Sequence, residues 1–375
     1  MEYPVKKWAD VVHIISGKNQ KEVASPNGIY PIYGSGGIIG QANEYLCEAG
    51  TTIVGRKGTI NRPIFVNERF WNVDTAFGIA PGKALLPKYL FYFCQSYNFN
   101  ALDKSTTIPS LAKRDLLNIK MPIPSISEQK RIVARIEELF SQLDASVKEL
   151  KTAKERLTVY RQAVISMAYP VLTDENTGTL SDIAEISGGI TKGRKLENSE
   201  TVSLPYLRVA NVQNGYLNLT EIKKIQLKKT EIEKYLLKFG DVLYTEGGDR
   251  DKLGRGTIWR NEIENCVHQN HIFKARVDAE RALPLYISYW SMGTSARNYF
   301  YAKGKQSVNL ASINKTVLSM LPIPLVSLER QKQVVTEIEA KMSICDSIEK
   351  TVDTALQQAE ALRQSILKKA FEGRL

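Results

Sequence analysis

The sequence lacks a long hydrophobic run: no stretch approaches the roughly 18 apolar residues that a membrane helix needs. The segment Met1–Asp10 lacks the basic-then-apolar pattern of a secretory signal. Cysteine is scarce, and the four residues form no Cys-x-x-Cys pair: Cys47, Cys94, Cys266 and Cys345. Scattered cysteines fit a reducing compartment better than a disulfide framework. We therefore expect a cytoplasmic protein with no membrane partner.

Catalytic motifs are also missing. The glycine-rich segment Gly34–Gly40 has Ile39 at the sixth position of a G-x-G-x-x-G pattern, so the dinucleotide fingerprint fails. Gly188 to Lys195 has P-loop spacing, but Arg194 and Lys195 stand where Lys and Ser/Thr are required. It reads better as a basic loop near phosphates. No Asn-Pro-Pro-Phe methyltransferase string occurs.

The charge balance is basic. The 375 residues include 51 Lys and Arg against 40 Asp and Glu, a net charge of +11 and a pI near 9.3. This balance is compatible with a polyanion partner such as DNA, although many basic proteins never bind nucleic acid. With 43% hydrophobic residues the chain is globular, and its length favours two domains.

An internal repeat organises the chain. Met121–Pro124 recurs as Leu321–Pro324, 200 residues later, and from Glu128 onward the two copies match at an offset of 202. Between residues 128 and 171, 13 of 44 positions are identical across the repeat. Such a long period excludes a solenoid and indicates two tandem modules. We read an insertion of two residues in the second copy between these two matches.

Each module ends in a segment with helical periodicity. Apolar residues follow a sustained 4-3 spacing, which is typical of a coiled coil. Ser125–Glu128 is a capping box, Pro170 would stop the first helix and Gly373 the second. In the first stripe lie Ile132, Ile136, Leu139, Leu143, Ser146, Leu150, Ala153, Leu157, Tyr160, Val164 and Met167. The second contains Val334, Ile338, Lys341, Cys345, Ile348, Val352, Ala355, Ala359, Leu362, Ile366 and Lys369.

The two helices are predicted to pair with each other. Two copies of one unit pair most simply about an approximate two-fold axis, which makes the helices antiparallel. A helix over residues 127–169 would be about 65 Å long at ~1.5 Å per residue, close to two turns of B-DNA. A parallel pair, or two helices that each pack on their own domain, remain alternatives.

The remaining segments are mixed α/β. Strands are expected at 52–54, 62–66, 241–244 and 256–259, and helices at 86–99 and 283–301. The predicted fold class is therefore α+β, with two globular domains separated by an intramolecular coiled coil that has pseudo-two-fold symmetry. The predicted segments are 1–124 and 171–324 for the globular domains, and 125–170 and 325–375 for the helices.

This order of segments resembles the specificity subunit of type I restriction–modification systems, over essentially the whole chain. The helical starts, and the ending Arg363–Leu375, are similar to that family's conserved spacers. Pro31–Gly40, Gly55–Gly58 and Trp71–Asp74 look like one type of target recognition domain. Three other segments look like a second type of target recognition domain: Leu204–Val212, Gly240–Leu243 and Cys266–His271. Lys341 and Lys369 depart from the apolar stripe.

The resemblance implies a non-catalytic subunit that reads a split site in double-stranded DNA. Each recognition domain would read one block, and the coiled coil would set the gap. Two modification (methyltransferase) subunits would bind the helices, hold S-adenosylmethionine and methylate adenines, and restriction subunits would join for cleavage. No cofactor or metal is expected on this chain itself. A coiled-coil scaffold without sequence specificity is the alternative, although two dissimilar basic domains argue against it.

Residue types that suit base edges supply the candidate DNA contacts. Arg and Lys pair with guanine, whereas Asn and Gln pair with adenine. We expect about a third of them to touch DNA, mostly at phosphate. They are Arg56, Lys57, Asn72, Lys104, Arg208, Asn211, Arg255, Gln269, Asn270, Lys305 and Gln306. Cys266, His268 and His271 also invite a zinc site, but a fourth ligand is not evident, and a polar edge facing DNA is the preferred interpretation.

Overall fold

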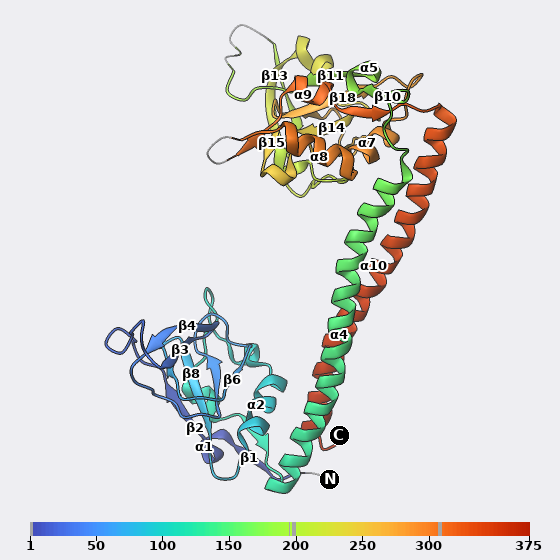
Figure 1. The fold of residues 1–375 in the computed structure, drawn as a ribbon. Helices are drawn as coiled ribbons and strands as arrows, with labels where there is room; N and C mark the ends of the chain where they lie inside the picture. The colour runs from blue at the N-terminus through green and yellow to red at the C-terminus, as the bar shows by residue number, and fades with distance from the viewer. Residues whose placement is uncertain (1–2, 195, 197–199, 307–309) are drawn as a thin grey trace. The chain divides into compact units, whose positions relative to one another are not determined.

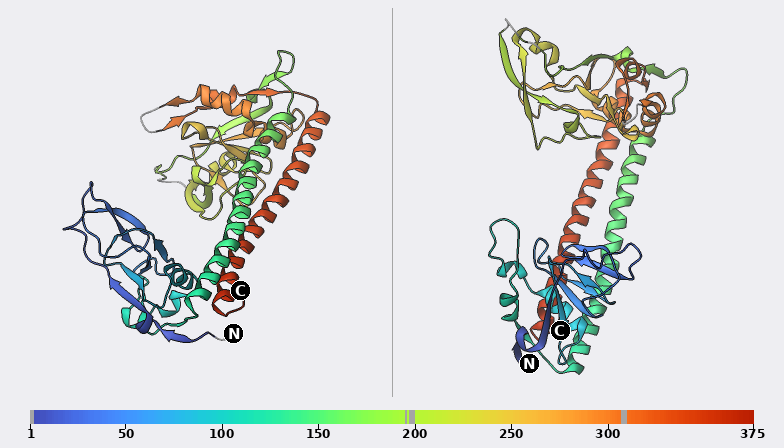
Figure 2. Two further views of the ribbon diagram at one scale, coloured as in Figure 1. Left: turned by 60° about the horizontal axis from the view of Figure 1, so that its bottom comes forward. Right: turned by 90° about the vertical axis from the view of Figure 1, so that its left-hand side faces the viewer.

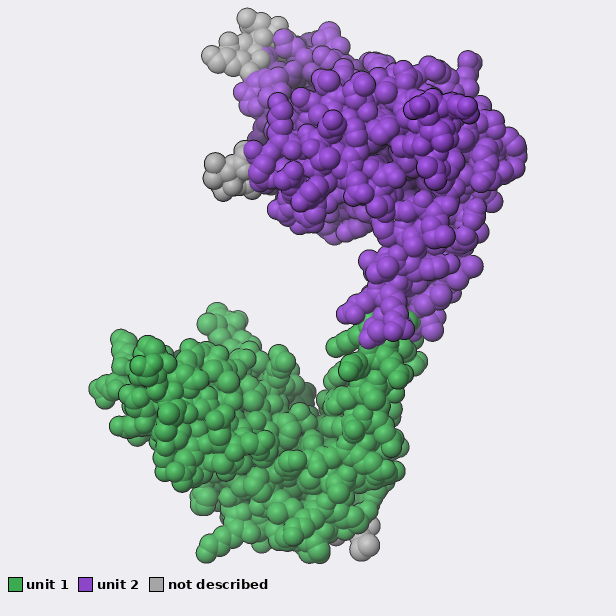
Figure 3. Space-filling view, in the orientation of Figure 1, with its two compact units in different colours: residues 1–151, 352–375 green, residues 152–351 purple. Residues whose placement is uncertain are grey.

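The computed structural model describes residues 3–194, 196, 200–306 and 310–375. The chain divides into two compact units. Unit 1 comprises Met1–Lys151 with Val352–Leu375, and unit 2 comprises Thr152–Thr351 (Figure 3). Each unit therefore combines one globular domain with segments of both long helices. The two units are described separately below.

The globular domain of unit 1 is built on two small sheets (Figure 1). An antiparallel four-stranded sheet has the order β2 (Val12–Ser16), β8 (Ala76–Pro81), β5 (Thr51–Gly55) and β6 (Ile64–Val66). A three-stranded sheet has the order β4 (Gly37–Ala42), β3 (Tyr30–Gly34) and β7 (Trp71–Asn72), with β3 and β7 parallel. The strand β1 (Val5–Lys7) pairs with β9 (Lys120–Pro122). Helical segments are α1 (Trp8–Val11), α2 (Pro87–Ser96), η1 (Phe99–Leu102) and α3 (Lys113–Leu117).

The globular domain of unit 2 repeats this topology. Its four-stranded sheet has the order β11 (Ala184–Gly188), β18 (Ile272–Val277), β14 (Val242–Thr245) and β16 (Gly256–Ile258). Its three-stranded sheet has the order β13 (Lys223–Lys228), β12 (Thr201–Leu207) and β17 (Val267–His268), with β12 and β17 parallel. The strand β10 (Thr177–Thr179) pairs with β21 (Pro322–Pro324).

Unit 2 extends this topology with one further sheet, where the described part of unit 1 has the isolated bridge between Lys57 and Ser110. A third sheet has the order β15 (Gly247–Gly248), β20 (Ala311–Ser312) and β19 (Lys305–Gln306). The helical segments of the domain are α5 (Leu180–Ile183), η2 (Val209–Asn211), η3 (Lys229–Glu231), α6 (Ile232–Tyr235), η4 (Arg250–Lys252), α7 (Pro284–Met292), α8 (Thr294–Lys303) and α9 (Lys315–Ser319). The single helix expected over 283–301 is corrected to two, because Gly293 adopts an extended conformation between α7 and α8.

Local sequence explains where the main helices begin. Pro87 and Pro284 stand in the first turns of α2 and α7, where a missing N–H costs nothing. The first long helix, α4 (Ile126–Ala168), starts after Ser125, whose Oγ accepts a hydrogen bond from the Glu128 N–H at 3.3 Å. The second, α10 (Leu328–Phe371), starts after Ser327, which accepts one from the Arg330 N–H at 3.3 Å. Gly373, at φ +70°, follows the end of α10.

The long helices run antiparallel within each unit. In unit 1 the start of α4 packs on the end of α10, and Ile132 and Ile136 share one hydrophobic core with Ile366 and Ala370. In unit 2 the end of α4 packs on the start of α10, where Ile165 shares a core with Ile338. Both views of Figure 2 show the two helices side by side. The alternatives of a parallel pair and of unpaired helices are therefore excluded.

The contact seam of the helices differs in phase from the predicted stripe. Ile136, Leu143, Leu150, Leu157, Ile338 and Val352 are buried or half-buried, but Ile348 and Leu362 are 46% and 51% exposed. Each heptad contributes two residues to the seam. One of them agrees with the predicted stripe, and the other lies one position later in the sequence than the stripe predicted. These residues are Val133, Phe140, Val147, Lys154, Arg161 and Ala168 in α4, and Val335, Met342, Glu349, Leu356, Arg363 and Ala370 in α10. The exposure of Ile348, Leu362 and Lys369 follows directly from this shift.

The repeat keeps one offset of 202 residues from α3 onward. The buried Leu116 of α3 corresponds to Leu318 of α9, and β9 at 120–122 corresponds to β21 at 322–324. No insertion separates the strand from the helix, which corrects the interpretation of Met121–Pro124 and Leu321–Pro324 as equivalent segments. Their sequence match is shifted by two residues from the structural equivalence because Pro and Ile alternate there.

Candidate nucleic-acid interface

Equivalent strand ends in the two units carry the candidate site. In unit 1, Arg56 follows β5, its N–H donates to the Thr75 carbonyl at 2.8 Å, and its carbonyl accepts from the Leu111 N–H at 2.9 Å. In unit 2, Glu246 follows β14, its N–H donates to the His271 carbonyl at 2.9 Å, and its carbonyl accepts from the Ile313 N–H at 2.8 Å. Position 56 and position 246 are thus the same place in the fold, with opposite charges.

The unit 1 site is a basic hollow of about 350 Å³, whose lining includes Arg56, Lys57, Ser110 and Lys113. Gly55 allows the Thr59 carbonyl to approach closely, since a Cβ at position 55 would lie 2.1 Å from the Thr59 carbonyl oxygen. The Arg56 guanidinium lies 5.7 Å from the centroid of the Phe77 ring, and Lys57 is exposed. Arg56 is half-buried and its guanidinium also donates to the Asp74 carbonyl at a long 3.5 Å, so Lys57 is the more accessible of the two cations.

Two other unit 1 candidates are engaged elsewhere. Asn72 is fully buried, donates to the carbonyls of Ile15 and Ala76 at 3.4 and 3.1 Å, and lies 3.2 Å from Cys47 Sγ. Its role is structural, which corrects its assignment as a DNA contact. Lys104 is exposed and forms an ion pair of 3.1 Å with Asp115. Because the Lys104 end of this pair is exposed, the lysine can exchange the carboxylate for a phosphate.

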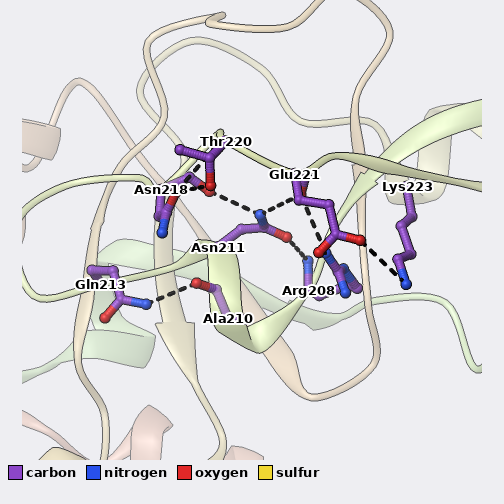
Figure 4. A network of polar contacts seen from close by, with 8 residues as sticks. All are labelled: Arg208, Ala210, Asn211, Gln213, Asn218, Thr220, Glu221 and Lys223. Atoms are coloured by element: carbon purple, nitrogen blue, oxygen red, sulfur yellow. Dashed lines mark hydrogen bonds and ion pairs between the residues drawn. The ribbon is translucent and has the colours of Figure 1, made fainter. Parts of the chain in front are cut away.

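In unit 2, Asn211 is also structural (Figure 4). Its side chain is 3% exposed, accepts from the Arg208 N–H at 2.8 Å, and donates to the carbonyls of Asn218 and Glu221 at 2.8 and 3.0 Å. Arg208 itself forms an ion pair of 3.0 Å with Glu221, which also contacts Lys223 at 3.3 Å. This network shapes the segment after β12, and it corrects the assignment of Asn211 as a DNA contact.

Several other unit 2 candidates gather around Glu246. β12 and β17 are parallel neighbours, so the segments that follow them, with Arg208 and with Gln269 and Asn270, leave the sheet at one edge. His271 comes next, and its Nδ1 lies 2.5 Å from Glu246 Oε2. Gly247 pairs with Ser312, which in turn pairs with Lys305 of β19. Lys305 and Gln306 are exposed, and Arg255 is half-exposed at the start of β16.

The side chains do not form a metal centre among the residues described. No group of three His, Cys, Asp or Glu side chains there is placed to hold an ion. Cys266 and His268 are buried, whereas His271 is exposed and pairs with Glu246. All four cysteines are buried and free, and burial raises the pKa of Cys47 and Cys266 to about 12. The thiols of Cys47 and Cys266 therefore stay protonated and unreactive near neutral pH.

The glycine-rich loop after β11 is held by an ion pair. Arg194 contacts both carboxylate oxygens of Glu231, at 2.9 and 3.1 Å, and the Glu231 side-chain hydrogen bond raises the pKa of Arg194. Lys195 lies outside the described residues. No helix in the described ranges is both long enough and apolar enough to traverse a bilayer.

Comparison with known proteins shows which family has this sequence and architecture. A family model described as type I restriction modification DNA specificity domain matches residues 2–155 and 174–358. The chain belongs to this family. It is a sequence-specific DNA-recognition subunit with two DNA specificity domains, one in each structural unit.

Similar proteins are named as specificity subunits of type I restriction enzymes. The specificity subunit of the StySPI type I restriction enzyme of Salmonella potsdam is 27% identical over 79% of this chain and 67% of its own. The EcoKI specificity subunit of Escherichia coli strain K12 is 26% identical over the same shares. The EcoDI specificity subunit of Escherichia coli is 22% identical and covers all of this chain and 89% of its own.

Solved structures share the fold. A chain from a study of complex assembly and conformational transition of the type I R-M system aligns with a TM-score of 0.73 and 16% identity, over 100% of this chain and 98% of that one. The HsdS subunit of Thermoanaerobacter tengcongensis aligns with a TM-score of 0.56 and 16% identity, over 100% and 97%. Both agree with the predicted α+β class.

Sequence reasoning missed Glu246 as a candidate specificity residue. The candidate contacts were drawn only from Arg, Lys, Asn and Gln, yet the strand Val242–Thr245 is followed by Glu246 just as Thr51–Gly55 is followed by Arg56. An alignment of the two strands would have revealed the equivalence. The sheet orders supply this alignment, since β5 and β14 each lie between the equivalents β8/β18 and β6/β16.

Proposed function

We propose that the two units of this specificity subunit each read one half of a split DNA site and that the chain itself performs no catalysis. The supporting observation is that one topology occurs twice, with different side chains at the equivalent strand ends. Arg56 and Lys57 stand in unit 1, where unit 2 has Glu246 and Gly247. One scaffold with two different sets of polar side chains is suited to two different base-pair blocks.

The helical pair is proposed to set the gap and to bind two modification subunits. Support comes from apolar side chains on the outer faces of the helices. Tyr160 of α4 is 52% exposed, and its equivalent Leu362 of α10 is 51% exposed. Exposed apolar residues at equivalent places on the two helices suit two identical partners. S-adenosylmethionine would be held by those partners, restriction subunits would join them, and the complex would act on cytoplasmic DNA.

Selection from a pool of random DNA duplexes tests the proposal. The full chain, alone or co-expressed with its modification partner, should enrich two short blocks separated by a constant gap. Exchanging residues 1–124 for another recognition domain should change one block only. Enrichment of no motif would favour a scaffold without specificity, and a change in both blocks would contradict independent readers.

A further inference from the structure

The place occupied by Arg56 in unit 1 carries a carboxylate in unit 2. The backbone hydrogen bonds that hold position 56 and position 246 match within 0.1 Å, as the pairs 2.8 and 2.9 Å and 2.9 and 2.8 Å show. Arg56 follows β5 and Glu246 follows β14, which are the third strands of the two equivalent four-stranded sheets. If DNA lies against this place in unit 1, it lies against the same place in unit 2.

Glu246 lines a hollow suited to a base edge. The hollow has a volume of about 530 Å³, and its lining includes Val209, Gly247, His271 and Ala311. Its only acidic lining residue in the described part of the chain is Glu246, whose side chain is 30% exposed. Gly247 and Gly248 place no side chain beside the carboxylate, and Val209, Leu310 and Ala311 add apolar groups to the lining.

His271 fixes the orientation of this carboxylate. Its Nδ1 lies 2.5 Å from Glu246 Oε2, and its Nε2 lies 3.4 Å from the Asn270 side-chain nitrogen. With Oε2 engaged, the other oxygen, Oε1, is the atom directed to a ligand. A carboxylate oxygen accepts hydrogen bonds and repels phosphate, so near DNA it suits only a donor on a base.

We propose that Glu246 is a specificity-determining residue of unit 2, which selects a base with an exocyclic amino group. In the major groove this group is N4 of cytosine or N6 of adenine. The arginine at the equivalent place in unit 1 suits the O6 and N7 acceptors of guanine instead. The proposal rests on the proposed function, because it requires that unit 2 reads DNA.

The test uses the full-length chain in selection from random duplexes, with the variants Glu246→Ala and Glu246→Arg. Wild type should prefer cytosine or adenine by about tenfold or more at one position of the unit 2 block. Which base is enriched identifies the donor. Glu246→Ala should abolish the preference there, and Glu246→Arg should replace it with guanine, while the unit 1 block stays unchanged.

Glu233→Ala is the matched control, since Glu233 is an exposed carboxylate of the same domain that pairs with Lys238 at 3.2 Å. It should leave the motif unaltered. A Glu246→Ala variant that selects the wild-type motif at every position overturns the proposal, and so does one that melts normally but loses both blocks. If wild type itself enriches no motif, the proposed function fails rather than the role of Glu246.

Discussion

Arg161 near the end of α4 forms an ion pair of 2.7 Å with Asp346 of α10, and the repeat forms the same pair again with the helices exchanged. The residues 202 positions away are Arg363 and Asp144, which are paired in unit 1. Arg161 is also bonded to Glu349 at 3.0 Å, and Arg363 stacks on Phe140 at 4.3 Å. Although burial opposes it, the hydrogen bond to Asp346 raises the pKa of Arg161.

Exchanging the charges of the Arg161–Asp346 pair in a double variant should restore part of the stability that each single substitution loses. Arg161→Asp and Asp346→Arg should each weaken the helix contact in unit 2, because each places like charges together. The double variant should recover about 0.5–1 kcal/mol, the scale of a partly exposed pair. Hydrogen exchange of the segments around 161 and 346 measures this locally. Additive losses in the double variant would show that the pair is uncoupled.

The phase of the seam predicts very different costs for two isoleucines of α10. Ile338 is fully buried, and Ile338→Ala should cost about 2–5 kcal/mol through lost burial and a residual cavity. Ile348 is 46% exposed, so Ile348→Ala should change stability by about 0.5 kcal/mol or less. Urea unfolding of both variants compares them, and equal losses would refute the shifted seam.

Substitutions of Asn211 and Arg56 should have different effects: the first should lower the stability of the fold, and the second should weaken DNA binding. Asn211→Ala leaves two carbonyls and the Arg208 N–H without their partners, and should cost about 1–3 kcal/mol. Arg56→Gln should leave the melting temperature unchanged but weaken DNA binding. Thermal melts and titration with the selected duplex provide the two readouts. A stable Asn211→Ala variant with impaired binding would reverse the assignment of Asn211 as structural.

The spacer role predicts the effect of lengthening both helices together. Seven residues inserted after Ala153 and seven after Val352 preserve the heptad phase, and add about 10 Å at ~1.5 Å per residue. The gap between the two DNA blocks should grow by about three base pairs at ~3.4 Å each. Insertion in α4 alone is the control, because it breaks the matching of the seam. A gap that stays the same after the paired insertion would contradict the spacer role.

The buried His268 predicts an acid-sensitive stability. Burial, with a smaller effect of Lys274, lowers the pKa of His268 to about 3, whereas an unfolded histidine titrates near 6.5. The unfolded chain therefore takes up the proton first as the pH falls. Stability from this site is complete above pH 6.5 and decreases toward pH 3, by up to about 1.4 kcal/mol per pH unit.

His268→Leu should reduce this pH dependence in urea unfolding measured between pH 7 and pH 4. The exposed His13 supplies the control, and His13→Gln should retain the wild-type slope. An unchanged slope in His268→Leu would show that other groups carry the acid sensitivity. In the described structure both ring nitrogens of His268 lack hydrogen-bond partners, so the neutral ring is the form the fold accommodates.

The sequence by itself determined the architecture. The repeat between 128 and 171 and its copy, the capping box Ser125–Glu128 and the 4-3 spacing are local or periodic signals, and they predicted two modules with paired helices. Periodicity could not determine the phase of the seam. The predicted stripe contained Tyr160, whereas the seam contains Arg161, one position later. Only the packed helices show that the arginine belongs inside, because Asp346 and Glu349 of α10 pair with it.

Tertiary structure alone decided which polar residues remain available to DNA. Asn72 has the residue type that reads adenine, but the carbonyl of Ile15, 57 residues away, binds it in the core. The equivalence of Arg56 and Glu246 likewise depends on strand order rather than on sequence likeness. Hydrogen-bond partners that are distant along the chain leave no local pattern, so their effect appears only when the sheets are assembled.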